Sequence, residues 1–147
     1  MNQFFILALP YVWRNFTTYV DAKLYGVEAG TGFIVGAGSI YSNGVWHGAP
    51  ANLNNLNRCL YPYAGVNNFL NNCLYLVNRP GKFSWINSGN GRLHDNMVRF
   101  DNVPVGRVMH GGHWYTGKIS LHGGLIYWSD DINEFYSPNY QALVYVL

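Results

Sequence analysis

The sequence predicts an all-β fold, built from two tandem β-rich repeats that pack as a pseudo-two-fold pair. Aromatic residues make up 17% of the 147 residues and are accompanied by seventeen glycines, a mixture typical of twisted strands joined by tight turns. Short apolar or alternating runs are separated by Asn-Gly, Gly-Gly and Pro-Gly pairs, which mark turns. No segment keeps the 3.6-residue apolar period of a helix, so we predict none.

Charged residues are sparse along the whole chain. They make up 11% of it, with a formal net charge of +2, whereas an average globular chain has about 25%. Such weak, unclustered charge argues against a nucleic-acid partner and against an anionic membrane surface. No apolar run reaches the length of a membrane span, so we predict no membrane insertion.

Residues 1–12 are predicted to form an N-terminal arm. Their apolar run is short, is broken by Pro10 and lacks a preceding basic region, so it is a weak export signal. Cys59 and Cys73 make no disulfide framework; we interpret them as small buried residues, with a single bridge as the alternative. These features favour the cytoplasm, and secretion without a clear signal peptide stays open.

Seven short runs with apolar or alternating side chains are predicted as strands. The Asn-rich residues 52–57 between them are predicted as a loop, because Asn side chains compete for backbone hydrogen bonds. The strand predictions cover 18–20, 32–35, 59–61, 73–77, 96–100, 125–128 and 142–146.

The two halves of the chain keep the same order of motifs, which predicts a first repeat over 13–84 and a second over 85–147. Repeats of about seventy residues are too small to bury a core comfortably alone, so we expect them to share one by packing face to face or by exchanging strands. The aligned anchors are Trp13 with Trp85, 35–37 with 105–107, 44–48 with 112–117, 59–61 with 125–127, and 76–77 with 143–144.

The second half resembles the DM-nine tandem-repeat family. That family has a Val-Gly-Arg strand followed by His-x-Gly, a Gly-Lys turn with an aliphatic residue, an apolar strand and a closing Tyr-x-x-Leu. The first half matches less well, with Ala37 in the place of the arginine and 49–50 in the place of the lysine and aliphatic residue. The matching segments are 91–98, in which His94 replaces a usual proline, 105–112, 117–119, 125–127 and 140–144.

The resemblance implies a lectin-like protein that binds mannose-type sugars near the junction of the two repeats, acts in innate recognition and uses no cofactor or metal. It assigns the sugar to an acidic residue before the Val-Gly-Arg strand, here Asp101, and to the lysine of the turn, here Lys118. In the first half Glu28 falls opposite Asp101 in the alignment.

General chemistry agrees with these assignments. A carboxylate accepts hydrogen bonds from paired sugar hydroxyls, and an ammonium group donates to the remaining oxygens. An aromatic face covers the C–H side of the ring, for which Trp114, Tyr115 and Trp46 are candidates. The alternative interpretations are structural: Asp101 as a turn former and Lys118 as a solvated surface charge.

Arg107 and two polar clusters allow further interpretations. Alternation places Arg107 on the face of Val105, where it could be a buried ion-pair partner or a sugar donor. Strand alternation and the lack of a completing carboxylate argue against a metal site, and a polar turn argues against paired hydrolase carboxylates. The histidines are His110, His113 and His122, and the acids are Asp130, Asp131 and Glu134.

The sequence therefore predicts a carbohydrate-binding, lectin-like recognition protein without catalysis. The alternative is a structural or assembly module on the same repeats that has lost sugar binding. Aromatic edges and a nearly neutral surface are also compatible with a homodimer or a protein assembly. A recognition module of a larger toxin-like assembly is a third, less supported interpretation.

Overall fold

The chain is mostly β-strand, which confirms the predicted all-β class. The described part holds no apolar helix of the length that spans a bilayer. A computed structural model describes residues 11–16, 18–30, 33–40, 44–48, 59–63, 66–70, 74–78, 82–129 and 133–146, with backbone alone for 33, 38–40, 44–48, 59–63, 66–70 and 129.

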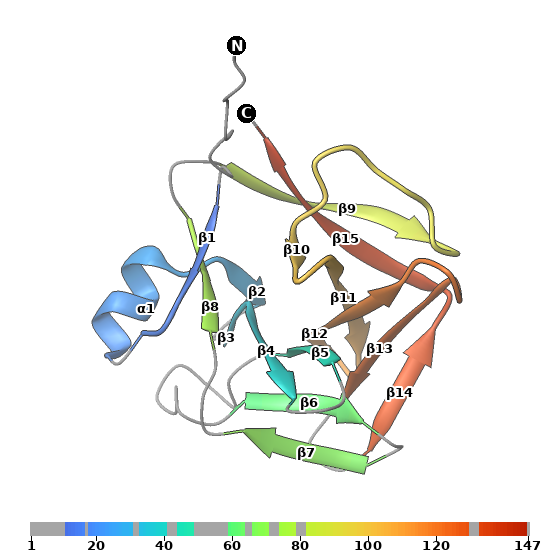
Figure 1. Cartoon of the computed structure of the whole chain (residues 1–147), viewed down its shortest axis with the longest axis horizontal. Coiled ribbons are helices and arrows are strands. Elements are labelled where there is room, and N and C mark those ends of the chain that lie inside the picture. Colours follow the sequence, from blue (N-terminus) through green and yellow to red (C-terminus); the bar gives the residue numbers. More distant parts are fainter. Residues whose placement is uncertain are drawn as a thin grey trace.

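Two antiparallel sheets form most of the described structure (Figure 1). The smaller sheet has the strand order β1(Val12–Arg14), β8(Leu74–Val77), β4(Gly36–Ile40) and β5(Gly44–Gly48). The larger sheet has the order β14(Glu134–Ser137), β13(Leu125–Ser129), β12(His113–Ser120), β11(Val103–His110), β15(Asn139–Val146) and β9(Lys82–Gly89), with β10(Arg99–Phe100) paired to β11. Two hairpins complete the fold, β2(Glu28–Gly30) with β3(Phe33–Ile34) and β6(Cys59–Tyr63) with β7(Val66–Leu70).

The order β1-β8-β4-β5 has the same pattern as β9-β15-β11-β12 in the larger sheet. The anchors of the sequence alignment also occupy corresponding register positions. A duplication with the predicted boundaries stays a prediction, and β9 begins at Lys82, before the predicted start of the second repeat. The corresponding cross-strand pairs are Trp13 with Leu76 and Trp85 with Leu143, and Gly36 with Tyr75 and Gly106 with Ala142.

Two local predictions are wrong. Residues Tyr19–Tyr25 form the helix α1, where we predicted a strand over 18–20 and no helix. The Thr18 hydroxyl caps this helix by accepting from the Asp21 amide at 3.1 Å. With seven residues, about two turns, the helix is too short to display an apolar period. The strand predicted over 96–100 shrinks to β10, because Asn96 has φ +62° and leaves the extended conformation.

The core between the two halves is shared. One buried cluster combines side chains from both predicted repeats, so neither half buries these residues alone. A second cluster fills the opposite face of the larger sheet and comes from the second half. The shared cluster contains Tyr11, Val27, Ala29, Val35 and Leu76 from the first half and Val98, Val105 and Leu143 from the second.

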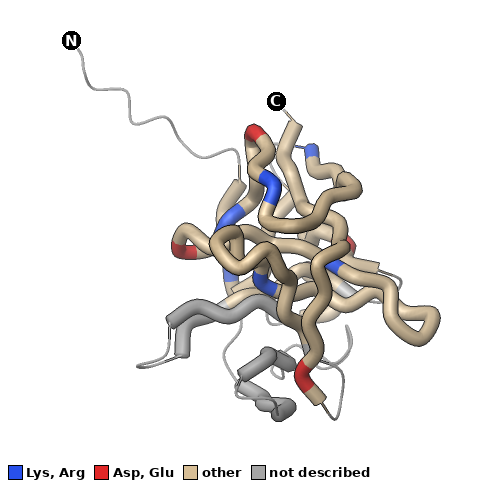
Figure 2. Tube along the Cα trace, turned by 90° about the vertical axis from the view of Figure 1, so that its right-hand side faces the viewer, with Lys and Arg blue, Asp and Glu red and all other residues tan. Residues whose placement is uncertain are grey.

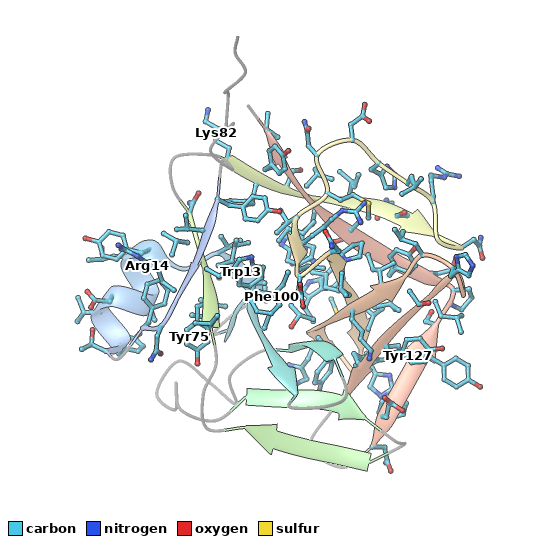
Figure 3. All side chains as sticks on the ribbon, viewed as in Figure 1. Trp13, Arg14, Tyr75, Lys82, Phe100 and Tyr127 are labelled. Carbon is cyan, nitrogen blue, oxygen red and sulfur yellow. The ribbon has the colours of Figure 1, made fainter. Side chains whose placement is uncertain are left out.

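Two tryptophans tie the halves together by reciprocal hydrogen bonds. The Trp13 indole N–H donates to the carbonyl of Arg99 at 3.2 Å, and the Trp85 indole N–H donates to the carbonyl of Glu28 at 3.1 Å. Trp13 also packs edge-on against Phe100, with 5.2 Å between ring centroids, as their neighbouring labels in Figure 3 indicate. Each half therefore satisfies a main-chain acceptor of the other.

Candidate functional site

Arg107 lies at the centre of the candidate site. Its position on β11 gives it the same sheet face as Val105, as alternation predicts. The guanidinium Nε donates to Gln141 Oε1 at 2.8 Å, and Nη1 donates to the carbonyl of Ala29 at 2.8 Å. Because Ala29 belongs to the first half, this side chain reaches across the junction of the two halves.

Two tryptophan rings enclose the guanidinium. Its central carbon lies 4.6 Å from the Trp85 ring centre and 3.9 Å from the Trp114 ring centre, which is the geometry of paired cation–π contacts. Gly30 permits this packing, because a Cβ at that position would lie 2.8 Å from Trp114 Cβ. The two rings and the two hydrogen bonds leave little rotational freedom to Arg107.

The electrostatics of Arg107 are unusual for a half-buried cation. Burial lowers the pKa of Arg107, and the nearby charge of Glu28 partly opposes this effect. No carboxylate among the described residues comes within ion-pair distance of the guanidinium. The ion-pair interpretation of Arg107 therefore finds no partner in the described part of the chain.

An open groove of about 480 Å³ begins beside Arg107. Strands β11 and β15 pair at only two positions, Gly106 with Ala142 and Arg107 with Gln141. Beyond these positions the backbones of the two strands line opposite sides of the groove, together with polar and aromatic side chains. Lining residues that bear on its chemistry are Asn87, Trp114, Trp128, Ser137, Tyr140 and Gln141.

Hydrogen bonds connect three polar side chains of the groove in series. Arg107 donates to the Gln141 oxygen, and Gln141 Nε2 donates to Asn87 Oδ1 at 3.0 Å. With its oxygen accepting from Gln141, Asn87 keeps its amide nitrogen as a donor that has no acceptor among the described residues. An amide donor thus lies two hydrogen bonds away from the arginine.

Trp128 forms part of the groove wall and keeps a polar atom unused. Its side chain is 5% exposed, and its indole N–H has no acceptor in the part of the chain that the structure describes. His110 packs edge-on to this ring at 5.9 Å and tilts against Phe135 at 4.7 Å. The groove therefore combines a cation, amides and aromatic surfaces.

Asp101 and Lys118 are not brought together in this groove. Asp101 and Asn102 have φ of +49° and +68° and form the two-residue turn between β10 and β11, so the turn-former interpretation of Asp101 is correct. Lys118 is half-buried on the inner strand β12, opposite Val105. Neither residue forms an ion pair within the described ranges, and neither lines the groove.

The predicted correspondence of Glu28 with Asp101 needs a correction. Glu28 pairs with Ile34, and Arg99 pairs in the same way with Pro104. The strand register therefore matches Glu28 with Arg99. The sequence alignment gave a different match because it did not account for the register shift within β2, between Glu28 and Gly30. Glu28 is exposed and acts on the site through its charge near Arg107.

The other sequence candidates lie at the end of the groove, apart from it or outside the described residues. His110 lines the groove where it closes the β11–β12 hairpin with His113, and His122 lies exposed in the next turn. Within the described ranges, no three potential metal ligands cluster. Tyr115 packs against His110. The side chains of Trp46 and Cys59, and all of Cys73, Asp130 and Asp131, lie outside the described residues, whereas Glu134 begins β14.

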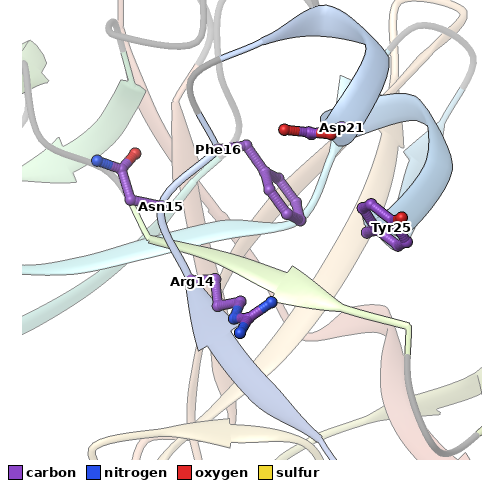
Figure 4. A pocket seen from close by; sticks show the side chains of 5 residues that line it. All are labelled: Arg14, Asn15, Phe16, Asp21 and Tyr25. Atoms are coloured by element: carbon purple, nitrogen blue, oxygen red, sulfur yellow. The ribbon is translucent and has the colours of Figure 1, made fainter.

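A second cavity of about 400 Å³ lies between β1 and α1. Figure 4 shows Arg14, Phe16 and Tyr25 around it, with Asp21 on the helix. The ring of Phe16 stacks on the buried Tyr75, with centroids 5.7 Å apart. Arg14 and Asp21 form no ion pair with each other, so this cavity exposes one charge of each sign.

Sequence reasoning found Arg107 and Trp114 but missed Trp85, Gln141 and Asn87 as site residues. Trp85 was an anchor of the repeat alignment, and Gln141 lies within the Tyr-x-x-Leu motif, so both positions carried a signal. Their meeting with Arg107 depends on the pairing of β11 with β15 and of β15 with β9. A one-dimensional pattern does not contain that pairing.

No protein-family model matches the chain, and no curated protein matches it. The resemblance to the DM-nine repeat therefore stays a prediction based on motifs. Figure 2 shows that the Lys and Arg segments and the Asp and Glu segments are scattered along a mostly uncharged trace. The described surface therefore offers single charges, amides and aromatic rings, and no strongly charged patch.

Proposed function

We propose that this protein recognises glycans without catalysis, and that the groove beside Arg107 holds the sugar. The observation that carries the proposal is a guanidinium held over two tryptophan rings, next to a groove lined by the amide side chains of Gln141, Asn87 and Asn139. Sugar recognition requires fixed donors and acceptors for hydroxyl pairs and an apolar surface for C–H groups.

Each requirement has a counterpart in the groove. Asn87 and Asn139 line the groove with amide side chains, and the Asn87 nitrogen has no acceptor among the described residues. Trp114 supplies aromatic surface. The resemblance to the DM-nine repeat favours a mannose-type sugar. It also assigns the sugar to Asp101 and Lys118, which lie outside the groove and form the alternative site.

A glycan array with the full chain tests the proposal. We expect retained glycans, and we expect Trp114→Leu to reduce their retention by about tenfold or more. Lys118→Ala and Asp101→Asn should retain glycans like the unmodified chain, because neither side chain lines the groove. Loss of retention in these two variants, with Trp114→Leu unaffected, would move the site to the motif residues. An array that retains no glycan would end the carbohydrate proposal.

A role as an assembly module is the second candidate, favoured by one surface. Large hydrophobic side chains on α1 are exposed, with Leu24 at 66% and Val20 at 62%. Such apolar surface is typical of protein contacts. Sedimentation of the chain and of a Val20→Ser, Leu24→Ser double variant tests this role: a concentration-dependent oligomer that the double substitution dissociates would support it, and a monomer in both would refute self-assembly through α1.

A further inference from the structure

We propose that the groove selects a sugar residue that carries a carboxylate, and that Arg107 is the residue that binds this group. The inference rests on the proposed function and names its ligand class. It departs from the neutral mannose-type sugar that the sequence resemblance implies. The starting point is the set of donors that the protein leaves unused on the guanidinium.

Arginine carries five N–H donors, and the protein occupies two of them here. Nε is bound to Gln141 and one N–H of Nη1 to the carbonyl of Ala29. The Nη2 group has no protein acceptor within the described part of the chain. The central carbon of the guanidinium lies over both tryptophan rings, and Arg107 lines the groove, so we take the donors that face the groove as the ones that a ligand can reach.

A carboxylate is the group that matches such an edge. Its two oxygens accept parallel hydrogen bonds from a guanidinium, and this fork pairing is shorter and stronger than a bond from a neutral hydroxyl. None of the described residues that line the groove carries a carboxylate of its own. No carboxylate of the described lining residues therefore competes with a ligand for the Arg107 guanidinium. The nearby Glu28 is exposed and is not one of the lining residues.

The rest of the groove indicates a sugar acid in preference to a simple carboxylate. A ring bound at Arg107 through its carboxylate places its hydroxyls along the groove, where the side-chain amides of Asn87 and Asn139 can exchange hydrogen bonds with them. The groove volume of about 480 Å³ exceeds what a lone carboxylate needs. Contacts with the ring hydroxyls would thus make the groove bind a uronic or sialic acid residue more tightly than a free carboxylate such as acetate.

Matched ligands test the proposal without altering the protein. Methyl α-mannoside and methyl α-mannuronoside differ only at C6, and the corresponding glucoside and glucuronoside form a second pair; the methyl glycoside of N-acetylneuraminic acid adds a third acid. Titration of the full chain, followed by amide NMR shifts, should give at least one acid that binds about tenfold tighter than the neutral sugars. Acetate at equal concentration should produce no comparable shift.

Protein variants then assign the preference to Arg107. Arg107→Gln should abolish the acid preference, and Arg107→Lys, which keeps the charge but not the fork, should reduce it to about threefold. Arg14→Gln is the matched control, because this arginine lines the other cavity. Thermal unfolding of each variant separates loss of binding from loss of folding; if Arg107→Gln does not fold, the lysine variant decides.

The outcomes distinguish the inference from the function on which it rests. Equal binding of acid and neutral sugars, or an acid preference that survives in Arg107→Gln, would overturn the carboxylate inference and leave glycan recognition standing. Equal shifts with acetate would overturn the assignment to a sugar acid. Binding of no acid, no neutral sugar and no array glycan would overturn both proposals.

Discussion

The indole Nε1 of Trp85 donates a hydrogen bond to the main-chain carbonyl of Glu28, 3.1 Å away and 57 residues earlier in the chain. Trp13 makes the corresponding bond to Arg99. The same Trp85 ring also covers the guanidinium of Arg107. One side chain therefore joins the two halves and forms a wall of the candidate site.

We expect Trp85→Phe to lower the free energy of unfolding by about 1–2 kcal/mol, because the carbonyl of Glu28 loses its donor while an aromatic ring is retained. Urea denaturation followed by circular dichroism measures the change. Trp114→Phe is the control, since its indole N–H makes no hydrogen bond in the described part of the chain. An equal loss in both variants would show that ring size, and not the hydrogen bond, carries the effect.

Gly117 is predicted to tolerate no side chain. A Cβ there would collide with the carbonyl oxygen of Tyr127 on the neighbouring strand, and backbone cannot move aside without breaking the sheet. Gly117→Ala should cost about 1–3 kcal/mol or more in urea denaturation. Gly123→Ala, whose Cβ would face only the movable Ser120 hydroxyl at 3.1 Å, should stay within about 0.5 kcal/mol of the parent chain. A stable Gly117→Ala variant would contradict the register of β12 with β13.

Thr116 carries a buried hydroxyl that the fold does not use. The residue is 4% exposed, and its Oγ1 has no partner within the described ranges. Thr116→Val keeps the shape and removes the unsatisfied group, so we expect a stabilisation of about 1 kcal/mol in thermal unfolding. Thr116→Ala should be less stable than the valine variant, because it leaves a cavity. A destabilised valine variant would indicate that the hydroxyl does have a partner.

Burial raises the pKa of Tyr75 above its ordinary value. The folded state thus favours the protonated phenol, and this contribution to stability is complete below about pH 10, the pKa of an unfolded tyrosine. Above that pH the unfolded chain loses the proton while the folded chain keeps it, so the free energy of unfolding falls by up to about 1.4 kcal/mol per pH unit from this group.

Chemical denaturation at a series of pH values from about two units below to about one unit above the ordinary tyrosine pKa measures that slope. Tyr75→Phe should show a shallower decline than the parent chain. Tyr136→Phe serves as the control because Tyr136 is 68% exposed, and its slope should match the parent. Identical slopes in all three proteins would contradict the burial of the Tyr75 hydroxyl.

The sequence predicted those strands whose side chains alternate or stay apolar. The runs over 125–128 and 142–146 lie within β13 and β15, because a two-residue period is visible without knowledge of the partner strand. Strand β9 contains Ser84, Asn87 and Ser88 among apolar residues and was not predicted as a strand. Its conformation follows from pairing along its full length with β15, which local sequence does not reveal.

The candidate site was predicted only in part for the same reason. Alternation correctly placed Arg107 on the face of Val105, since that requires only the local strand. Its acceptor at Ala29 is 78 residues away, and its acceptor at Gln141 is 34 residues away. Asp101 was interpreted from its neighbours alone, and its positive φ bears out the local part of that interpretation, a turn former; its assignment to a ligand stays a prediction.

The half of the molecule that lacks the arginine still shapes the site of the half that has it. In the alignment, Ala37 of the first half occupies the position of Arg107. The first half nevertheless accepts a hydrogen bond from the guanidinium at the carbonyl of Ala29. It also allows Trp114 to pack closely, because Gly30 has no side chain. A side chain at Gly30 would displace Trp114 and thereby the ring that holds Arg107 in place. If the groove binds a ligand as we propose, a substitution in the first half would therefore change the specificity of a groove whose lining residues all come from the second.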